Sequence, residues 1–188
     1  MCRRSILPVV LLAALMLAAC GGGSSAAGST PTTSALKLSS PSYETAKPSP
    51  SKSAKMICET EVRGEIAQSL GVTETRVKAT WSKQQHLYSC TYVYPRGKIV
   101  LSVKEMSSER ETTAYFDATR NKYGTKQALI GLAQGAFILA NQDVVVRNDY
   151  KVLLVDVKGI PADFVHGLYR SGVASRIATV IMACWTGA

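Results

Sequence analysis

The chain has 188 residues, and its 22 basic and 13 acidic side chains give a formal net charge of +9 at pH 7. The charge is spread unevenly, because residues 56–188 hold 16 Lys and Arg against 12 Asp and Glu, a net charge of +4. These basic residues form no run, so the composition argues against a nucleic-acid-binding domain, and we expect no nucleic-acid partner.

The first 20 residues have the three parts of a secretory signal. Arg3 and Arg4 open the segment, residues 6–17 carry no charge, and small residues close it. The quartet at positions 17–20, Leu-Ala-Ala-Cys, resembles the lipobox of bacterial lipoproteins. This resemblance implies cleavage before Cys20, a diacylglyceryl thioether on its sulfur and acylation, for example by palmitate, of the new amino group. An uncleaved anchor and an ordinary secretory signal are the alternatives.

We therefore divide the chain into a signal peptide (1–19), a lipidated cysteine with a disordered linker (20–55) and one domain (56–188). The linker is rich in Gly, Ser, Thr, Ala and Pro and buries too little apolar surface to order itself. As a flexible coil it reaches about 30 Å. Its composition also suits O-glycosylation, although a plain spacer is the simpler interpretation. The domain would then lie at the extracytoplasmic face of the cell membrane, held by a lipid anchor.

Cys58, Cys90 and Cys184 are the cysteines of this domain, since Cys2 is lost with the signal and Cys20 carries the lipid. An exported domain meets an oxidising compartment, and three cysteines allow at most one internal disulfide in three possible pairings. We favour Cys58–Cys90, which would join the first helix to a central strand and contribute about 3–4 kcal/mol. Cys184 would then be a buried free thiol. The alternative is that all three are reduced.

Hydrophobic periodicity predicts the elements of the first half of the domain. Apolar residues at every fourth position over 58–70 predict an amphipathic helix. Alternating patterns over 76–83, 87–94 and 98–104 predict three strands that pair as a meander. A capping box of Ser and Glu opens a second helix over 108–123.

The second half repeats this arrangement. Strands are predicted over 136–140, 144–147 and 151–157, and the last should be central because it is apolar on both faces. Pro161 opens a long helix that runs to about Cys184. The order α-βββ-α-βββ-α with short connections predicts an α+β fold, with a mostly antiparallel sheet and helices packed on it.

Several local features accompany this layout: the lipobox and spacer, Cys58 opening the first helix, Cys90 in a tyrosine-rich strand, Gly-Leu-Ala-Gln-Gly-Ala-Phe at 131–137, and Ala-Cys-Trp at 183–185. In these features the chain resembles a group of actinobacterial lipoproteins of unknown function. The resemblance covers the domain from about Met56 to the end. It implies a membrane-tethered sensor or binding domain and brings no catalytic residue with it.

One aromatic cluster is a candidate binding surface. Tyr88, Tyr92 and Tyr94 share a strand face, and Trp81 should lie nearby. Rings with an apolar body and a polar tip suit a ligand or partner surface. Core packing beneath the first helix is the competing interpretation, and we favour it because Cys90 shares the same face.

Titratable residues give little support for catalysis or for a metal site. Cys184 falls on an apolar helix stripe, where a thiol is normally inert. His86 and His166 stand apart, and no C-x-x-C spacing occurs. Two matches to the S-x-x-K spacing, at 34–37 and 49–52, lie in the linker. We expect no enzymatic activity, no metal and no cofactor.

The leading hypothesis is a non-catalytic binding or accessory domain at the cell envelope, whose partner is an envelope protein or glycan. A carrier of a lipid or another small apolar ligand is the first alternative, and it requires an enclosed apolar cavity. An envelope hydrolase is the second, and it requires paired polar groups such as Asp156 and His166. The sheet face opposite the helices should discriminate among them, according to whether it is open and whether it is apolar or polar.

Overall fold

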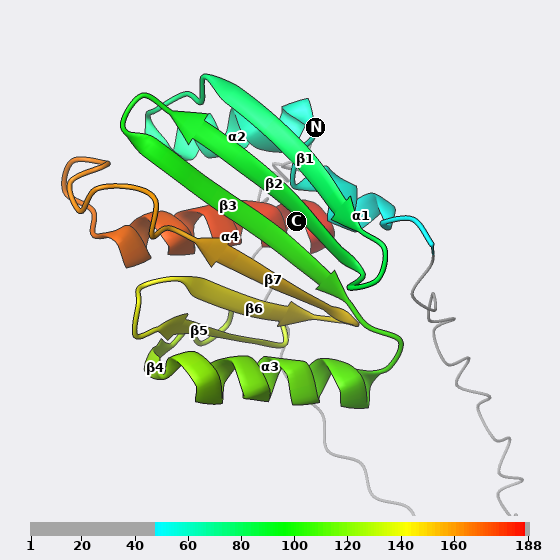
Figure 1. The fold of residues 1–188 in the computed structure, drawn as a ribbon. Helices are drawn as coiled ribbons and strands as arrows, with labels where there is room; N and C mark the ends of the chain where they lie inside the picture. Colours follow the sequence, from blue (N-terminus) through cyan, green and yellow to red (C-terminus); the bar gives the residue numbers. More distant parts are fainter. Residues whose placement is uncertain (1–47, 187–188) are drawn as a thin grey trace, which may run out of the picture. The chain divides into compact units, whose positions relative to one another are not determined.

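The computed structural model describes residues 48–186, which form one seven-stranded antiparallel sheet with helices packed on it (Figure 1). The helices are α1 (Lys52–Met56), α2 (Thr60–Leu70), α3 (Glu109–Tyr123) and α4 (Arg170–Thr186). The strands are β1 (Arg76–Ser82), β2 (Leu87–Tyr94), β3 (Gly97–Glu105), β4 (Thr125–Ala128), β5 (Gly135–Leu139), β6 (Val144–Asn148) and β7 (Lys151–Asp156). The predicted α+β class is confirmed.

Strand order across the sheet is β1-β2-β3-β7-β6-β5-β4. Two meanders, β1 to β3 and β4 to β7, therefore meet where β3 pairs with β7. Strand β7 lies at the centre, as its pattern predicts, and its Leu153 and Val155 are fully buried. The sheet thus has two edge strands, β1 and β4.

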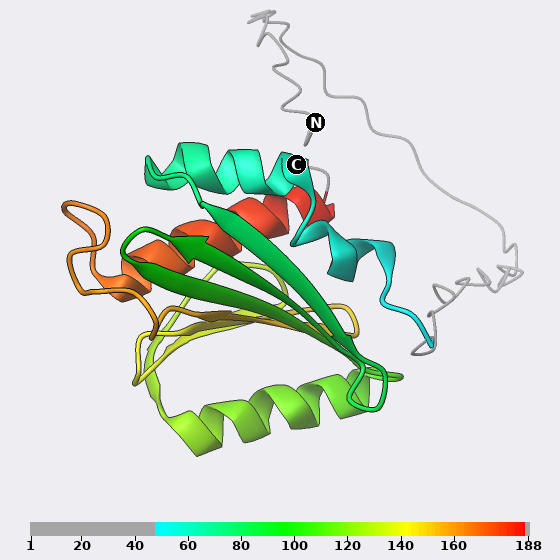
Figure 2. The same cartoon turned by 45° about the horizontal axis from the view of Figure 1, so that its top comes forward.

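Helices α2 and α4 lie side by side on one face of the sheet (Figure 2). Their inner residues are apolar, for example Ile66 on α2 and Ile177 on α4, and they pack with Cys90 and Leu101 into the main core. The predicted Cys58–Cys90 disulfide is present, with the two Cα atoms 5.6 Å apart. It ties the segment between α1 and α2 to the buried face of β2.

Helix α3 lies on the opposite face. Its Phe116 packs on Phe137 of β5, with ring centroids 4.6 Å apart, above a second cluster that includes Val145 and Val152. These contacts involve β5, β6 and β7, at one side of the sheet. No described helix covers the corresponding face of β1, β2 and β3 (Figures 1 and 2).

The structure differs from the predictions in the start of the folded domain, in one additional strand and in the start of the last helix. Folded structure begins before residue 56, since Ser51 caps α1 by accepting a hydrogen bond from Ala54 N, and Ala54 is fully buried. Strand β4 was not predicted because all four of its residues are exposed and polar or small. The last helix begins at Arg170 and not at Pro161, because Gly167 has φ +76° and turns occupy the segment before the helix.

Cys184 also departs from its prediction. Its side chain is half-buried on α4, and Sγ lies 3.5 Å from Glu65 Oε2 of α2. The expectation of a fully buried free thiol is therefore wrong. Within residues 48–186, no helix combines the length and the apolar character that crossing a bilayer requires.

Candidate functional site

Two residues of the predicted aromatic surface, Tyr92 and Tyr94, lie in the core, with exposed fractions of 1% and 3%. The alternation that aligns them with Cys90 turns all three toward α2 and α4. Tyr92 Oη donates a hydrogen bond of 2.7 Å to Ile57 O, and the Tyr94 ring meets Phe164 edge-on at 5.1 Å. Core packing, the interpretation we favoured, is therefore confirmed for this pair, and the candidate binding surface is wrong for it.

The other two residues, Trp81 and Tyr88, are cross-strand neighbours at the margin of the same face, and both are half-buried. Trp81 Nε1 donates to Pro48 O at 3.2 Å, and its ring lies 6.1 Å from that of His86. Burial, with the nearby Glu59 carboxylate, raises the pKa of Tyr88. Trp81 thus fastens the segment before α1 to the sheet, and the four aromatic residues form no common exposed surface.

The two core tyrosines provide a matched test of this packing. Tyr92→Phe should lower the free energy of unfolding by about 1–3 kcal/mol, because it leaves the buried Ile57 carbonyl without its donor. Tyr94→Phe should be neutral or stabilising, because the buried Tyr94 hydroxyl has no hydrogen-bond partner among the described residues. Urea unfolding measures both variants. Equal effects at the two positions would contradict these assignments.

The uncovered face of β1, β2 and β3 is the candidate site, and we call it the open face. Strand alternation places twelve side chains on it, in four cross-strand rows: Arg76–Val93–Lys98, Lys78–Thr91–Val100, Thr80–Ser89–Ser102 and Ser82–Leu87–Lys104. The Ser89 and Ser102 hydroxyls lie 2.9 Å apart in the third row. The open face is therefore rich in hydroxyl groups as well as in basic side chains.

The charge on the open face has one sign. Arg76, Lys78, Lys98 and Lys104 lie on it, and none of its twelve residues is Asp or Glu. Glu105, at the end of β3, faces the other way and accepts hydrogen bonds from Ser51 N. Asp156 of β7 borders these positions beside Val100 and is paired with Lys158, so the four cations on the twelve positions leave an excess of positive charge that attracts anions.

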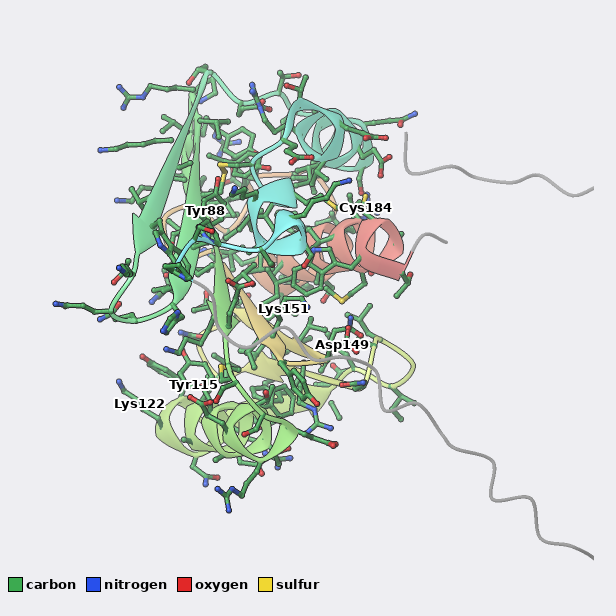
Figure 3. The ribbon with its side chains drawn as sticks, turned by 90° about the vertical axis from the view of Figure 1, so that its right-hand side faces the viewer. Tyr88, Tyr115, Lys122, Asp149, Lys151 and Cys184 are labelled. Atoms are coloured by element: carbon green, nitrogen blue, oxygen red, sulfur yellow. A yellow bond between two sulfur atoms is a disulfide. The ribbon has the colours of Figure 1, made fainter. Side chains whose placement is uncertain are left out.

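Helix α3 borders the open face on the side of β7. Tyr115 and Tyr123 of α3 are 40% and 43% exposed, and Lys104 Nζ lies 5.9 Å from the centre of the Tyr115 ring. Figure 3 shows Tyr115 on the side of α3 toward the sheet and Lys122 at the flank of the helix, extending outward. Burial raises the pKa of Tyr115 above its ordinary value. Helix α3 thus adds aromatic rings and a further cation beside the open face.

A buried carboxylate lies at the end of the sheet. Asp143 is 2% exposed, and its oxygens accept hydrogen bonds from Val157 N (2.9 Å) and Asn141 Nδ2 (2.8 Å). Lys158 Nζ lies 3.8 Å from it and 3.1 Å from Asp156. Burial is the main cause that raises the pKa of Asp143. These contacts fix the ends of β6 and β7, so Asp143 has a structural role.

Asp143 should make stability depend on pH in the acidic range. Its pKa in the folded protein lies above that of the unfolded chain, so the folded state holds the proton more tightly. The stabilisation that protonated Asp143 provides is fully present at pH values below its pKa in the unfolded chain. It is lost as the pH rises through its pKa in the folded protein. Asp143→Asn should remove this fall in stability while keeping an acceptor for Val157 N–H. Asp143→Ala should cost about 1–3 kcal/mol because that N–H is left unpaired. Urea unfolding over a series of pH values tests both, and an unchanged pH slope in Asp143→Asn would contradict the shift.

The residues proposed for a hydrolase are not brought together. Asp156 is bound to Lys158, and His166 is exposed in the loop before α4. No group of three His, Cys, Asp or Glu side chains in the described part of the chain is arranged to hold a metal ion. An open hollow beside α3 is lined by residues of that helix alone, so it is not an enclosed cavity: Glu109, Arg110, Thr113, Ala114 and Asp117.

Comparisons of the chain with protein-family models, curated proteins and solved structures found no match. The open face is therefore assigned as the candidate site from the geometry and charge of its residues alone. Sequence reasoning missed the open face, because Lys, Thr and Ser at alternate strand positions are typical of any solvated strand. The available signal was that the outward positions of three successive strands include four cations and no acid.

Proposed function

We propose that this protein is a lipid-anchored, extracytoplasmic binding domain without catalytic activity, and that its open face binds an extended anionic glycan of the cell envelope. The observation that carries the proposal is the excess of cations on an uncovered sheet face. The hydroxyl groups of the Thr80–Ser89–Ser102 row, which lies between the row of Lys78 and the row of Lys104, can hydrogen-bond to sugar hydroxyls. The half-exposed tyrosines of α3 offer rings against which sugar rings can pack.

The position of α3 favours an extended polymer over a flat bilayer. Helix α3 packs on the same side of the sheet as the open face, next to the row that contains Lys104. A helix with its side chains is about 10–12 Å thick, so α3 projects beyond the neighbouring open face. A planar membrane would meet α3 first, whereas a single polymer chain can lie along the strands.

Location in the envelope follows from the proposed lipidation of Cys20. The quartet at positions 17–20 lies outside the described residues, and support for lipidation comes from the charged start, apolar run and small residues of the sequence. A linker of about 30 Å would hold the domain above the membrane and within reach of envelope polymers. The resemblance to actinobacterial lipoproteins supports the same location.

The two alternatives find less support. An apolar carrier needs an enclosed apolar cavity, whereas the helix-covered face is filled by packed side chains such as Ile99, Leu101 and Ile177. A hydrolase needs convergent polar groups, and Asp156 and His166 have other surroundings. The open face has the wrong chemistry for a lipid tail and the right one for an anion.

Charge reversal tests the proposal. The mature lipoprotein in neutral-lipid nanodiscs should bind polygalacturonate, a carboxylated glycan, and should not bind neutral dextran. Lys78→Glu with Lys98→Glu should weaken this binding by at least about tenfold, since each exposed ion pair contributes about 0.2–1 kcal/mol and reversal replaces attraction by repulsion.

The matched control is Lys52→Glu with Lys126→Glu, which makes the same change in net charge on α1 and β4. This control should bind almost as wild type. Equal losses in both variants would contradict a localised site. Loss of glycan binding when the nanodisc lipid is made anionic would show that the open face docks on the membrane instead, which also contradicts the proposal.

A further inference from the structure

Strand β1 is an edge strand with no neighbouring strand on its outer side in the described sheet. It has seven residues, contains no proline, and forms backbone hydrogen bonds within the described chain only on its β2 side. The other edge, β4, has four residues, carries Lys126 and has an irregular register at Thr125 and Gln127. Short length, lysine and bulges are the features that protect edge strands from pairing. Strand β4 thus combines all three features, whereas β1 carries the basic residues Arg76 and Lys78 but is longer and pairs with β2 in a regular register.

We propose that β1 pairs with β1 of a second copy of this chain, antiparallel and centred on Ala79, so that the two sheets become one. A two-fold axis perpendicular to the sheet would relate the copies. Backbone groups on the outer side of β1 would gain partners along the whole strand. A two-fold axis perpendicular to the sheet does not exchange its two faces. The open faces of the two copies would therefore lie next to each other on the same side of the joined sheet.

The sequence of β1 fits this register and fits its neighbours less well. Centring on Ala79 pairs all seven residues of the strand with residues of the second copy. Residue 76 lies opposite 82, 77 opposite 81, 78 opposite 80, and Ala79 opposite Ala79. Arg76 then faces Ser82, and Lys78 faces Thr80, so no like charges are directly opposite. Centring on Lys78 would place this lysine opposite itself. Centring on Thr80 would leave Arg76 and Val77 unpaired.

Side chains on the other face of β1 support the same pairing. Val77 and Trp81 are half-buried and Ala79 is exposed on the side toward α2. In the proposed register Val77 of each copy lies opposite Trp81 of the other, so the dimer contains two such pairs. Aromatic side chains opposite β-branched ones stabilise antiparallel pairs. The nearest like charges are the two Lys78 side chains on a diagonal, about 7–8 Å apart and free to diverge into solvent.

Thr80 provides the test, because it is exposed and would lie opposite Lys78 of the other copy at two symmetric positions. Analytical ultracentrifugation of the mature lipoprotein in detergent should show a reversible dimer. Thr80→Glu should tighten it and Thr80→Lys should loosen it, so that the two dissociation constants differ by roughly tenfold or more. Thr125→Glu and Thr125→Lys make the same changes on β4 and should leave the dimer unchanged.

Ala79→Cys supplies a second measurement, since residues opposite one another on antiparallel strands have Cα atoms within disulfide range. Oxidation should link this variant to itself, whereas Gln127→Cys on β4 should remain unlinked. A monomer at all concentrations would overturn the proposal. So would a dimer that responds to Thr125 and not to Thr80, or a link formed only through β4.

Discussion

Removal of the Cys58–Cys90 disulfide is expected to lower the free energy of unfolding by about 3–4 kcal/mol. The two cysteines are 32 residues apart, so without the bond the unfolded chain regains the entropy of a long loop. The bond also fixes the segment between α1 and α2, where Ile57 is fully buried and accepts the Tyr92 hydrogen bond. Urea unfolding of Cys58→Ala with Cys90→Ala against the wild type measures the loss.

A second pair of substitutions separates the crosslink from its surroundings. Cys58→Ser with Cys90→Ser places a hydroxyl at the fully buried position 90, and this should cost a further 1–3 kcal/mol or so relative to the alanine variant. An alanine variant within about 1 kcal/mol of the wild type would show that the crosslink contributes little and would contradict the account of this core.

Replacement of Cys20 is expected to abolish lipid attachment completely. Cells fed an alkyne-tagged fatty acid should label the wild-type protein, and Cys20→Ser should carry no label, because the hydroxyl cannot form the thioether. The wild type should also stay with the membrane through a high-salt wash, since two or more acyl chains anchor stably where one chain does not. Intact mass should place the mature start at residue 20.

Cys2→Ser is the matched control, because it changes the other cysteine near the N-terminus and leaves the lipobox intact. This variant should keep the label, the mature mass and the membrane retention. Label that persists in Cys20→Ser would contradict lipidation at this position. A Cys20 sulfur held in a disulfide would contradict it as well, because one sulfur cannot form both bonds.

Much of the fold was predictable because local chemistry and burial agree in most elements. Ser108 caps α3 by accepting a hydrogen bond from Glu111 N, as the capping box predicts. Alternation in β2 and β3 matches their observed burial, and β7 is apolar on both faces because it lies between β3 and β6. Helix α1 and strand β4 carry no such periodicity, so only tertiary contacts reveal them.

The candidate site was less predictable for a physical reason. Alternation says which residues share a face and leaves open which face a helix covers. Tyr92 and Tyr94 looked suited to binding, but the same parity that groups them with Cys90 places them beneath α2 and α4. Lys78 and Thr91 looked like ordinary solvated positions. Their importance emerges only because α3 packs on the β5 to β7 side and leaves their face uncovered.

Lysine reactivity tests the central claim, that the open face is the binding surface, most directly. The mature lipoprotein is treated with an acetylating reagent with and without polygalacturonate, and modification at each lysine is measured by mass spectrometry. The account predicts that the glycan protects Lys78, Lys98 and Lys104 and leaves Lys52 and Lys126 as reactive as before. Uniform protection of all five lysines, or protection of Lys52 and Lys126 alone, would contradict it.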